Sequence, residues 1–135
     1  MMDLIPWSDD FKTGDREIDH EHWGLFALIH DLAGKQAGGA DDASIASTIE
    51  ALVAYVDVHF EHEERLMQQL GYPDFAAHKK AHQALDKRVA EFQTEFQNAP
   101  HSFDYPAFMA FLSTWLGQHI LKQDMAFAAF RGKQP

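Results

Sequence analysis

The side chains best suited to chemistry are concentrated in the stretch HFEHEE, residues 59–64. Imidazoles and carboxylates carry protons and, when several of them face one point, they bind divalent metal ions. If the stretch is helical, His59 and Glu63 lie four residues apart and share a face. The other polar residues of the stretch then point toward solvent: Glu61, His62 and Glu64. The chemistry therefore depends on whether the face that carries His59 and Glu63 is buried.

Four long segments that Gly and Pro separate must position these groups. In each segment apolar residues recur at intervals of three and four, which is the period of one face of an α-helix and not of a strand. The pattern predicts helices over about residues 19–35, 42–70, 74–98 and 104–129. Short connections between long neighbouring helices favour an all-α, antiparallel up-down-up-down four-helix bundle.

The ends of the chain and of the helices carry further signals. Gly71 is expected to terminate the second helix and Asp104 to cap the start of the fourth. Residues 1–17 are expected to form an irregular N-terminal arm, whose Pro6, Trp7 and Phe11 pack on the bundle.

Six polar residues interrupt the apolar faces of these helices. They are distributed over all four helices: His22, His59, Glu63, His78, His82 and His119. A buried imidazole without partners costs roughly 1 to 3 kcal/mol, and a buried charge costs more. In an up-down-up-down bundle all six fall at the same end, and the rise of about 1.5 Å per residue brings them to one level. Metal binding offsets the cost of burying them, and five imidazoles with a carboxylate suit two metal ions better than one.

The helical period does not place Asp124 in this group. It follows His119 by five residues, an offset that turns its side chain about 140° away on a regular helix. Only a local widening of the helix, or an approach from the flank, would bring the two together. Spacing alone therefore leaves Asp124 either in the group or on the surface.

Bulk composition excludes several classes of function. At 135 residues the chain is about one domain long, and its formal net charge of −10 opposes binding to nucleic acids or to anionic membranes. The absence of cysteine excludes disulfides and thiolate metal sites. We see no secretory signal and no membrane span in the sequence, so we expect a cytoplasmic protein.

In combination, the motifs resemble those of the hemerythrin family, in particular its single-domain bacterial members. The resemblance covers nearly the whole chain and rests on four motifs in order: IDHEH at 18–22, HFEHEE at 59–64, HKKAH at 78–82 and HILKQD at 119–124. It implies two iron ions with an oxo or hydroxo bridge between them. One iron would be held by His78, His82 and His119, and the other by His22 and His59. Glu63 and Asp124 would bridge them, so the resemblance makes Asp124 a ligand.

The same resemblance implies that the iron with two histidines keeps an open position, where O2 binds reversibly. Apolar residues on the same helix faces are candidate walls of an O2 pocket, although ordinary core packing explains them equally well: Phe26, Phe60 and Trp115. The remaining histidines lie off the apolar faces and are expected at the surface or at helix ends: His20, His30, His62 and His101.

Several functions remain open at this point. A nonheme diiron centre could carry, store, deliver or sense O2, and the protein partner is unknown. The alternative is a diiron enzyme that activates O2 or reduces peroxide, but such enzymes use paired Glu-x-x-His motifs. This chain has one such motif, EIDH at 17–20, and it lies off the apolar face. We therefore expect a binding protein rather than an enzyme, and a structural zinc site is a further alternative.

Overall fold

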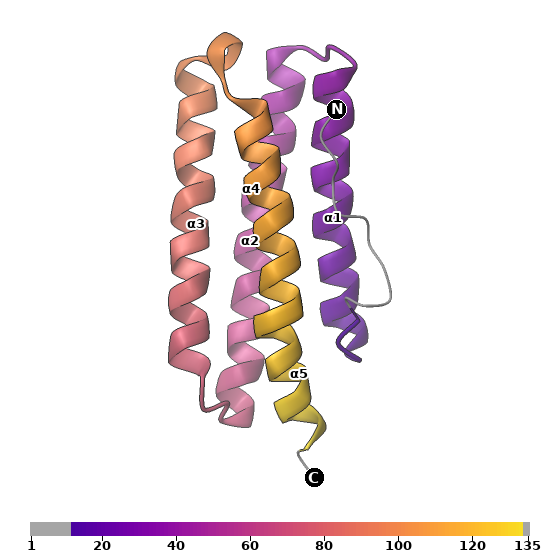
Figure 1. Cartoon of the computed structure of the whole chain (residues 1–135), viewed down its shortest axis with the longest axis vertical. Coiled ribbons are helices and arrows are strands. Elements are labelled where there is room, and N and C mark those ends of the chain that lie inside the picture. Colours follow the sequence, from indigo (N-terminus) through magenta and orange to yellow (C-terminus); the bar gives the residue numbers. More distant parts are fainter. Residues whose placement is uncertain (1–11, 134–135) are drawn as a thin grey trace.

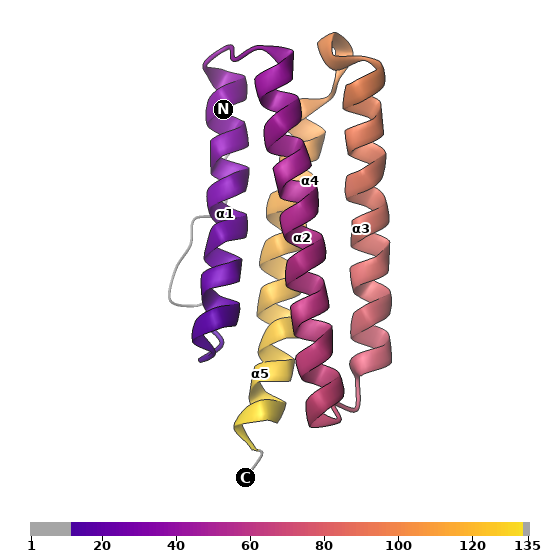
Figure 2. The same cartoon turned by 180° about the vertical axis from the view of Figure 1, so that it is seen from behind.

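Four helical rods joined at alternate ends make up the computed structural model of this chain (Figures 1 and 2). The structure describes residues 12–133, so the predicted packing of Pro6, Trp7 and Phe11 lies outside the described residues. Neighbouring rods run in opposite directions, and the described residues contain no strand. The predicted all-α antiparallel four-helix bundle is therefore confirmed.

The first three rods are single helices. They are α1 (Arg16–Ala37), α2 (Asp42–Leu70) and α3 (Phe75–Asn98), and a short 3₁₀ turn at Pro100–Ser102 follows α3. α1 begins three residues earlier than the spacing indicated, because the Asp15 carboxylate accepts a hydrogen bond from the N–H of Ile18 and caps the helix there. α2 ends at Gly71, whose φ of 66° is the left-handed conformation that glycine adopts without steric cost.

The fourth rod consists of three consecutive helical elements. They are α4 (Tyr105–Gln118), a π-helical turn η3 (His119–Asp124) and α5 (Met125–Gly132). Asp104 caps α4, because its side chain accepts a hydrogen bond of 3.0 Å from the N–H of Ala107. The predicted cap is thus confirmed. The π turn is the local widening of the helix that Asp124 required.

Two apolar clusters fill the interior. The polar layer, formed by the buried histidines and carboxylates, lies between them along α2, α3 and the fourth rod. The larger cluster spans most of the bundle and includes Phe60 of α2 and Ile120 of η3. The smaller cluster is centred on Met67, Tyr72 and Phe127. Glu63 thus stands between Phe60 and Met67, and Asp124 between Ile120 and Phe127. Apolar packing on both sides holds the polar layer at a fixed height in the bundle.

α2 is also the one helix of the described residues whose length and apolar composition would suit a membrane span. This is weak support for a membrane role, because the central helix of a bundle meets the same criteria. α2 packs against both α1 and α3, and its apolar face contributes Ile49, Leu52 and Val56 to the core.

Candidate metal centre

The structure brings all seven candidate ligands together. Each rod contributes at least one of them: His22 from α1, His59 and Glu63 from α2, His78 and His82 from α3, His119 and Asp124 from η3. None of the seven is more than 5% exposed. The predicted polar layer therefore exists, and its members come from segments up to about a hundred residues apart in the sequence.

The Glu63 carboxylate stands between two groups of histidines. Its Oε2 atom lies 3.1 Å from His59 Nε2 and 3.4 Å from His22 Nε2. Its Oε1 atom lies 3.1 Å from His78 Nε2 and 3.2 Å from His82 Nε2. One carboxylate thus directs a different oxygen atom toward each group.

Asp124 repeats this division from the opposite side of the layer. Its Oδ2 atom lies 2.9 Å from His22 Nε2, whereas its Oδ1 atom lies 3.1 Å from both His78 Nε2 and His119 Nε2. The π turn makes this possible, because it places residues five apart on one face of the helix. The two carboxylates therefore belong to two overlapping clusters of donor atoms, and in each cluster the atoms lie within 4.8 Å of one another.

Hydrogen bonding alone does not account for these contacts. Both oxygen atoms of Asp124, Nε2 of His59 and Nδ1 of His22 are buried without a hydrogen-bond partner. His82 Nε2 and His119 Nε2 face each other at 3.1 Å, and because the Nδ1 atoms of both rings donate to Glu64 and Gln123, neither Nε2 of the neutral rings has a proton to share. Buried polar atoms normally have partners, and convergent lone pairs with none are typical of a metal site. Nitrogen and carboxylate donors in this ratio suit iron, manganese or zinc.

The carboxylates of the layer favour the protonated form of its histidines. Burial lowers the pKa of His119, but the carboxylates of Asp124 and Glu63 outweigh it and raise that pKa to about 10. Burial likewise lowers the pKa of His59, while Glu63 and Glu21 raise it to about 9. Burial raises the pKa of Glu63, but the neighbouring histidines hold it well below its usual range. Metal ions would displace these protons, so metal binding is coupled to proton release.

An outer set of polar residues orients three of the histidines. The Nδ1–H of His59 donates to Glu21 at 2.7 Å, that of His82 to Glu64 at 2.9 Å, and that of His119 to Gln123 at 2.5 Å. A donor bond at Nδ1 leaves the Nε2 lone pair free and directed at the layer. The spacing of apolar residues does not predict this set, because all three residues lie off the apolar faces.

His62 and Glu64 are therefore not simply solvent-facing, as the helical spacing suggested. The Nδ1–H of His62 donates to Glu21 at 2.6 Å, so Glu21 connects partly buried His62 with the buried His59. The expectation of a surface position holds for the other three histidines, since His20, His30 and His101 are exposed.

Removing the Glu21 carboxylate tests the outer set. We expect Glu21→Ala to lower iron affinity about 10- to 100-fold, since His59 loses the group that fixes its tautomer and orientation. Glu17→Ala is the matched control, because the Glu17 side chain is 80% exposed and contacts only His62 in the described residues. Titration of the loaded proteins with a competing chelator measures the difference. Equal iron retention in both variants would show that Glu21 does not position the centre.

Aromatic rings cover the layer on the side of the larger apolar cluster. The Phe60 ring stacks on His82 at a centroid distance of 3.8 Å and an interplanar angle of 5°. Trp115 lies edge-on to Phe60 at 5.8 Å and stacks on His119 at 5.9 Å. Phe26 is buried in the same cluster. Phe60 and Trp115 thus border the candidate ligands directly, while Phe26 is placed in the core beside them.

This chain is similar to known proteins over almost its whole length. Residues 13–130 match the family described as the hemerythrin HHE cation binding domain. The bacteriohemerythrin of Stenotrophomonas maltophilia is 37% identical over 127 residues, which cover 94% of this chain and 81% of that relative. The bacteriohemerythrin of Methylococcus capsulatus is 33% identical over 127 residues, or 93% of this chain and 95% of that protein. A crystal structure of wild-type hemerythrin aligns with a TM-score of 0.85 at 33% identity, covering 94% of this chain and 97% of the other.

Proposed function

The chain belongs to the hemerythrin family, and from this membership and the geometry of the layer we propose that it binds O2 reversibly at a nonheme diiron centre. The observation that carries the proposal is the division of the two carboxylates. Oε2 of Glu63 and Oδ2 of Asp124 face His22, while Oε1 and Oδ1 face His78. Two carboxylates placed in this way support two metal ions that share both of them.

The unequal histidine count then distinguishes the two ions. His78, His82 and His119 would hold one, and His22 with His59 would hold the other, with Glu63 and Asp124 bridging and an oxo or hydroxo group between the ions. The second ion has one imidazole fewer, so we assign the open position for O2 to that side. Two ferrous ions would supply two electrons for the reversible reduction of O2.

The residues of the chain would control the surroundings of that position. Phe60 and Trp115 would exclude water from the apolar side of the layer and keep the O2 site dry. Glu21, Glu64 and Gln123 hold three imidazoles in the orientation for binding. The bridging carboxylates balance the charge of the cations within a region of low dielectric.

We infer binding rather than catalysis from the placement of the carboxylates. Diiron oxidases of helical bundles use carboxylate-rich sites built from paired Glu-x-x-His motifs. In this chain the EIDH segment lies at the start of α1, and both Glu17 and His20 are exposed. Among the described residues, the polar layer has five histidines and two carboxylates, a set that favours reversible binding.

An absorption spectrum tests the function. The reduced protein should change its spectrum when air is admitted and return to the starting spectrum when O2 is removed. Repeated cycles with constant amplitude are the expected result. A signal that decays while an added reductant is consumed would identify a diiron enzyme, and a protein with no O2-dependent spectrum would contradict the proposal.

A further inference from the structure

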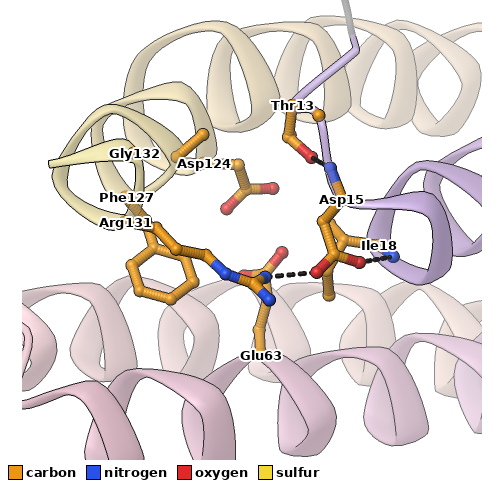
Figure 3. Close-up of a pocket in the computed structure, with 10 residues that line it drawn as sticks. Thr13, Asp15, Ile18, Glu63, Asp124, Phe127, Arg131 and Gly132 are labelled. Carbon is orange, nitrogen blue, oxygen red and sulfur yellow. Dashed lines mark hydrogen bonds and ion pairs between the residues drawn. The ribbon is translucent and has the colours of Figure 1, made fainter. Parts of the chain in front are cut away.

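A cavity of about 310 Å³ reaches the centre from the end of the bundle where α1 begins and α5 ends (Figure 3). Glu63 and Asp124 line its inner part. In Figure 3 both carboxylates point into the space between the start of α1 and the last helix. Asp124 is 3% exposed, and its oxygens lie 2.9 to 3.1 Å from the Nε2 atoms of His22, His78 and His119, so the space ends at the candidate ligands.

An ion pair between Asp15 and Arg131 spans the cavity. The Arg131 guanidinium donates to Oδ2 of Asp15, and the two residues are 116 positions apart in the sequence. The other oxygen of Asp15 accepts from the N–H of Ile18, so the carboxylate is fixed at the start of α1. The Arg131 side chain is 38% exposed and comes from the last turn of α5, so it can move without disturbing the core.

The other sides of the centre are less suitable for a charged species. Toward the larger cluster, Phe60 and Trp115 cover the histidines, and a divalent cation would lose its hydration there without compensation. A second cavity between α2 and α3 is also lined by carboxylates, among them Asp57, Glu61 and Asp86. Of the seven candidate ligands it reaches only His82, whose Nδ1–H donates to Glu64 and whose ring is covered by Phe60. Of the two cavities, only the one behind Asp15 and Arg131 is lined by Glu63 and Asp124.

We propose that this cavity is the route by which divalent metal ions enter and leave the centre, and that the Asp15–Arg131 ion pair closes it. This inference rests on the proposed diiron function. When Arg131 moves away, the Asp15 carboxylate becomes available to a hydrated cation at the outer opening of the cavity. Asp124 and Glu63 then offer carboxylate oxygens further in, so the cation exchanges water for protein oxygen in successive steps.

Metal exchange kinetics test this route without reference to O2 binding. We would measure uptake of Fe²⁺ by the metal-free protein and its release from the reduced, loaded protein to an Fe²⁺ chelator. Arg131→Ala should accelerate both uptake and release about tenfold, because it opens the mouth and removes a repelling charge. Asp15→Asn keeps the helix cap but breaks the ion pair, so release of Fe²⁺ to the chelator should also become faster than in the wild type.

Arg88→Ala is the matched control. Arg88 also forms an exposed ion pair, with Glu91 at 3.2 Å, and does not line the cavity. Rates in Arg131→Ala that equal those of the wild type, or an equal acceleration in Arg88→Ala, would overturn the proposed route. In that case two irons at equilibrium and an unchanged response to O2 would show that the centre itself is intact. A wild-type protein that takes up no iron would overturn the route and the function together.

Discussion

Glu63→Ala is expected to lose both metal ions while the helices remain. Glu63 presents one oxygen to His22 and His59 and the other to His78 and His82, so its removal takes a ligand from each ion at once. Removing a shared ligand also leaves the remaining imidazoles without the charge that stabilises a dication. We expect iron to fall from two ions per chain to near zero. Metal analysis measures this loss, and circular dichroism shows whether the helices persist.

Glu61→Ala is the control for this substitution. Glu61 lies two residues earlier on α2, is exposed, and contacts Arg65 at 3.7 Å without reaching the layer. It should retain the full complement of iron. The helices of Glu63→Ala should form because the larger apolar cluster does not depend on the layer. Iron content at the wild-type level in Glu63→Ala would show that the ligand assignment is wrong.

Removal of the metal is expected to make stability strongly dependent on pH. Without metal, the folded protein keeps His59 and His119 protonated up to pKa values of about 9 and about 10, above their ordinary value of 6.5. A raised pKa means that the folded state binds the proton more tightly than the unfolded state does. The resulting stability is complete below pH 6.5 and is lost as pH rises through 9 to 10. The raised pKa of His59 alone corresponds to a loss on the order of 3 kcal/mol, and His119 adds to it.

The loaded protein should not show this loss, because the metal ions replace the protons. The difference in unfolding free energy between loaded and metal-free protein should therefore widen between pH 6.5 and 10. Urea denaturation at a series of pH values measures it. In the metal-free state His119→Ala should flatten the profile, whereas His101→Ala, at a 90% exposed side chain, should leave it unchanged. Metal-free stability that stays constant or rises over this interval would contradict the assigned electrostatics.

The helical period was sufficient to predict the bundle and six of the seven residues of the layer. Histidine and glutamate at positions 22, 59, 63, 78, 82 and 119 fall on apolar faces, where their burial needs compensation. The helix order then places them at one end. The residue spacing and the short connections between helices can both be identified in the sequence, so this part of the site could be predicted from physical reasoning.

Asp124 could not be placed in that way, because a regular helix turns it away from His119. The π turn at His119–Asp124 changes the period for one turn only, and nothing in the residue pattern shows where such a turn occurs. The family resemblance, rather than the spacing, made Asp124 a candidate. Its position in the structure explains how the family motif HILKQD can supply two groups to one layer.

The hydrogen bonds of the outer set and the Asp15–Arg131 ion pair could not be predicted from the sequence, for another reason. Glu21 reaches His59 across a helix interface, and Asp15 meets Arg131 from the opposite end of the chain. Such contacts depend on the rotation of each helix about its axis. The apolar pattern defines this rotation only to within the width of the apolar face. Glu21 is adjacent to His22 in the sequence, and Glu64 to Glu63. Polar residues next to candidate ligands are therefore themselves candidates for hydrogen bonds that orient a ligand.

Anomalous diffraction at the iron edge from crystals of the loaded protein would locate the metal ions among the seven candidate ligands. We expect two peaks per chain, about 3.5 to 4 Å apart. One should lie among His22, His59 and the two carboxylates, and the other among His78, His82, His119 and the same carboxylates. A single peak, or two peaks that do not share Glu63 and Asp124, would contradict the proposed diiron centre.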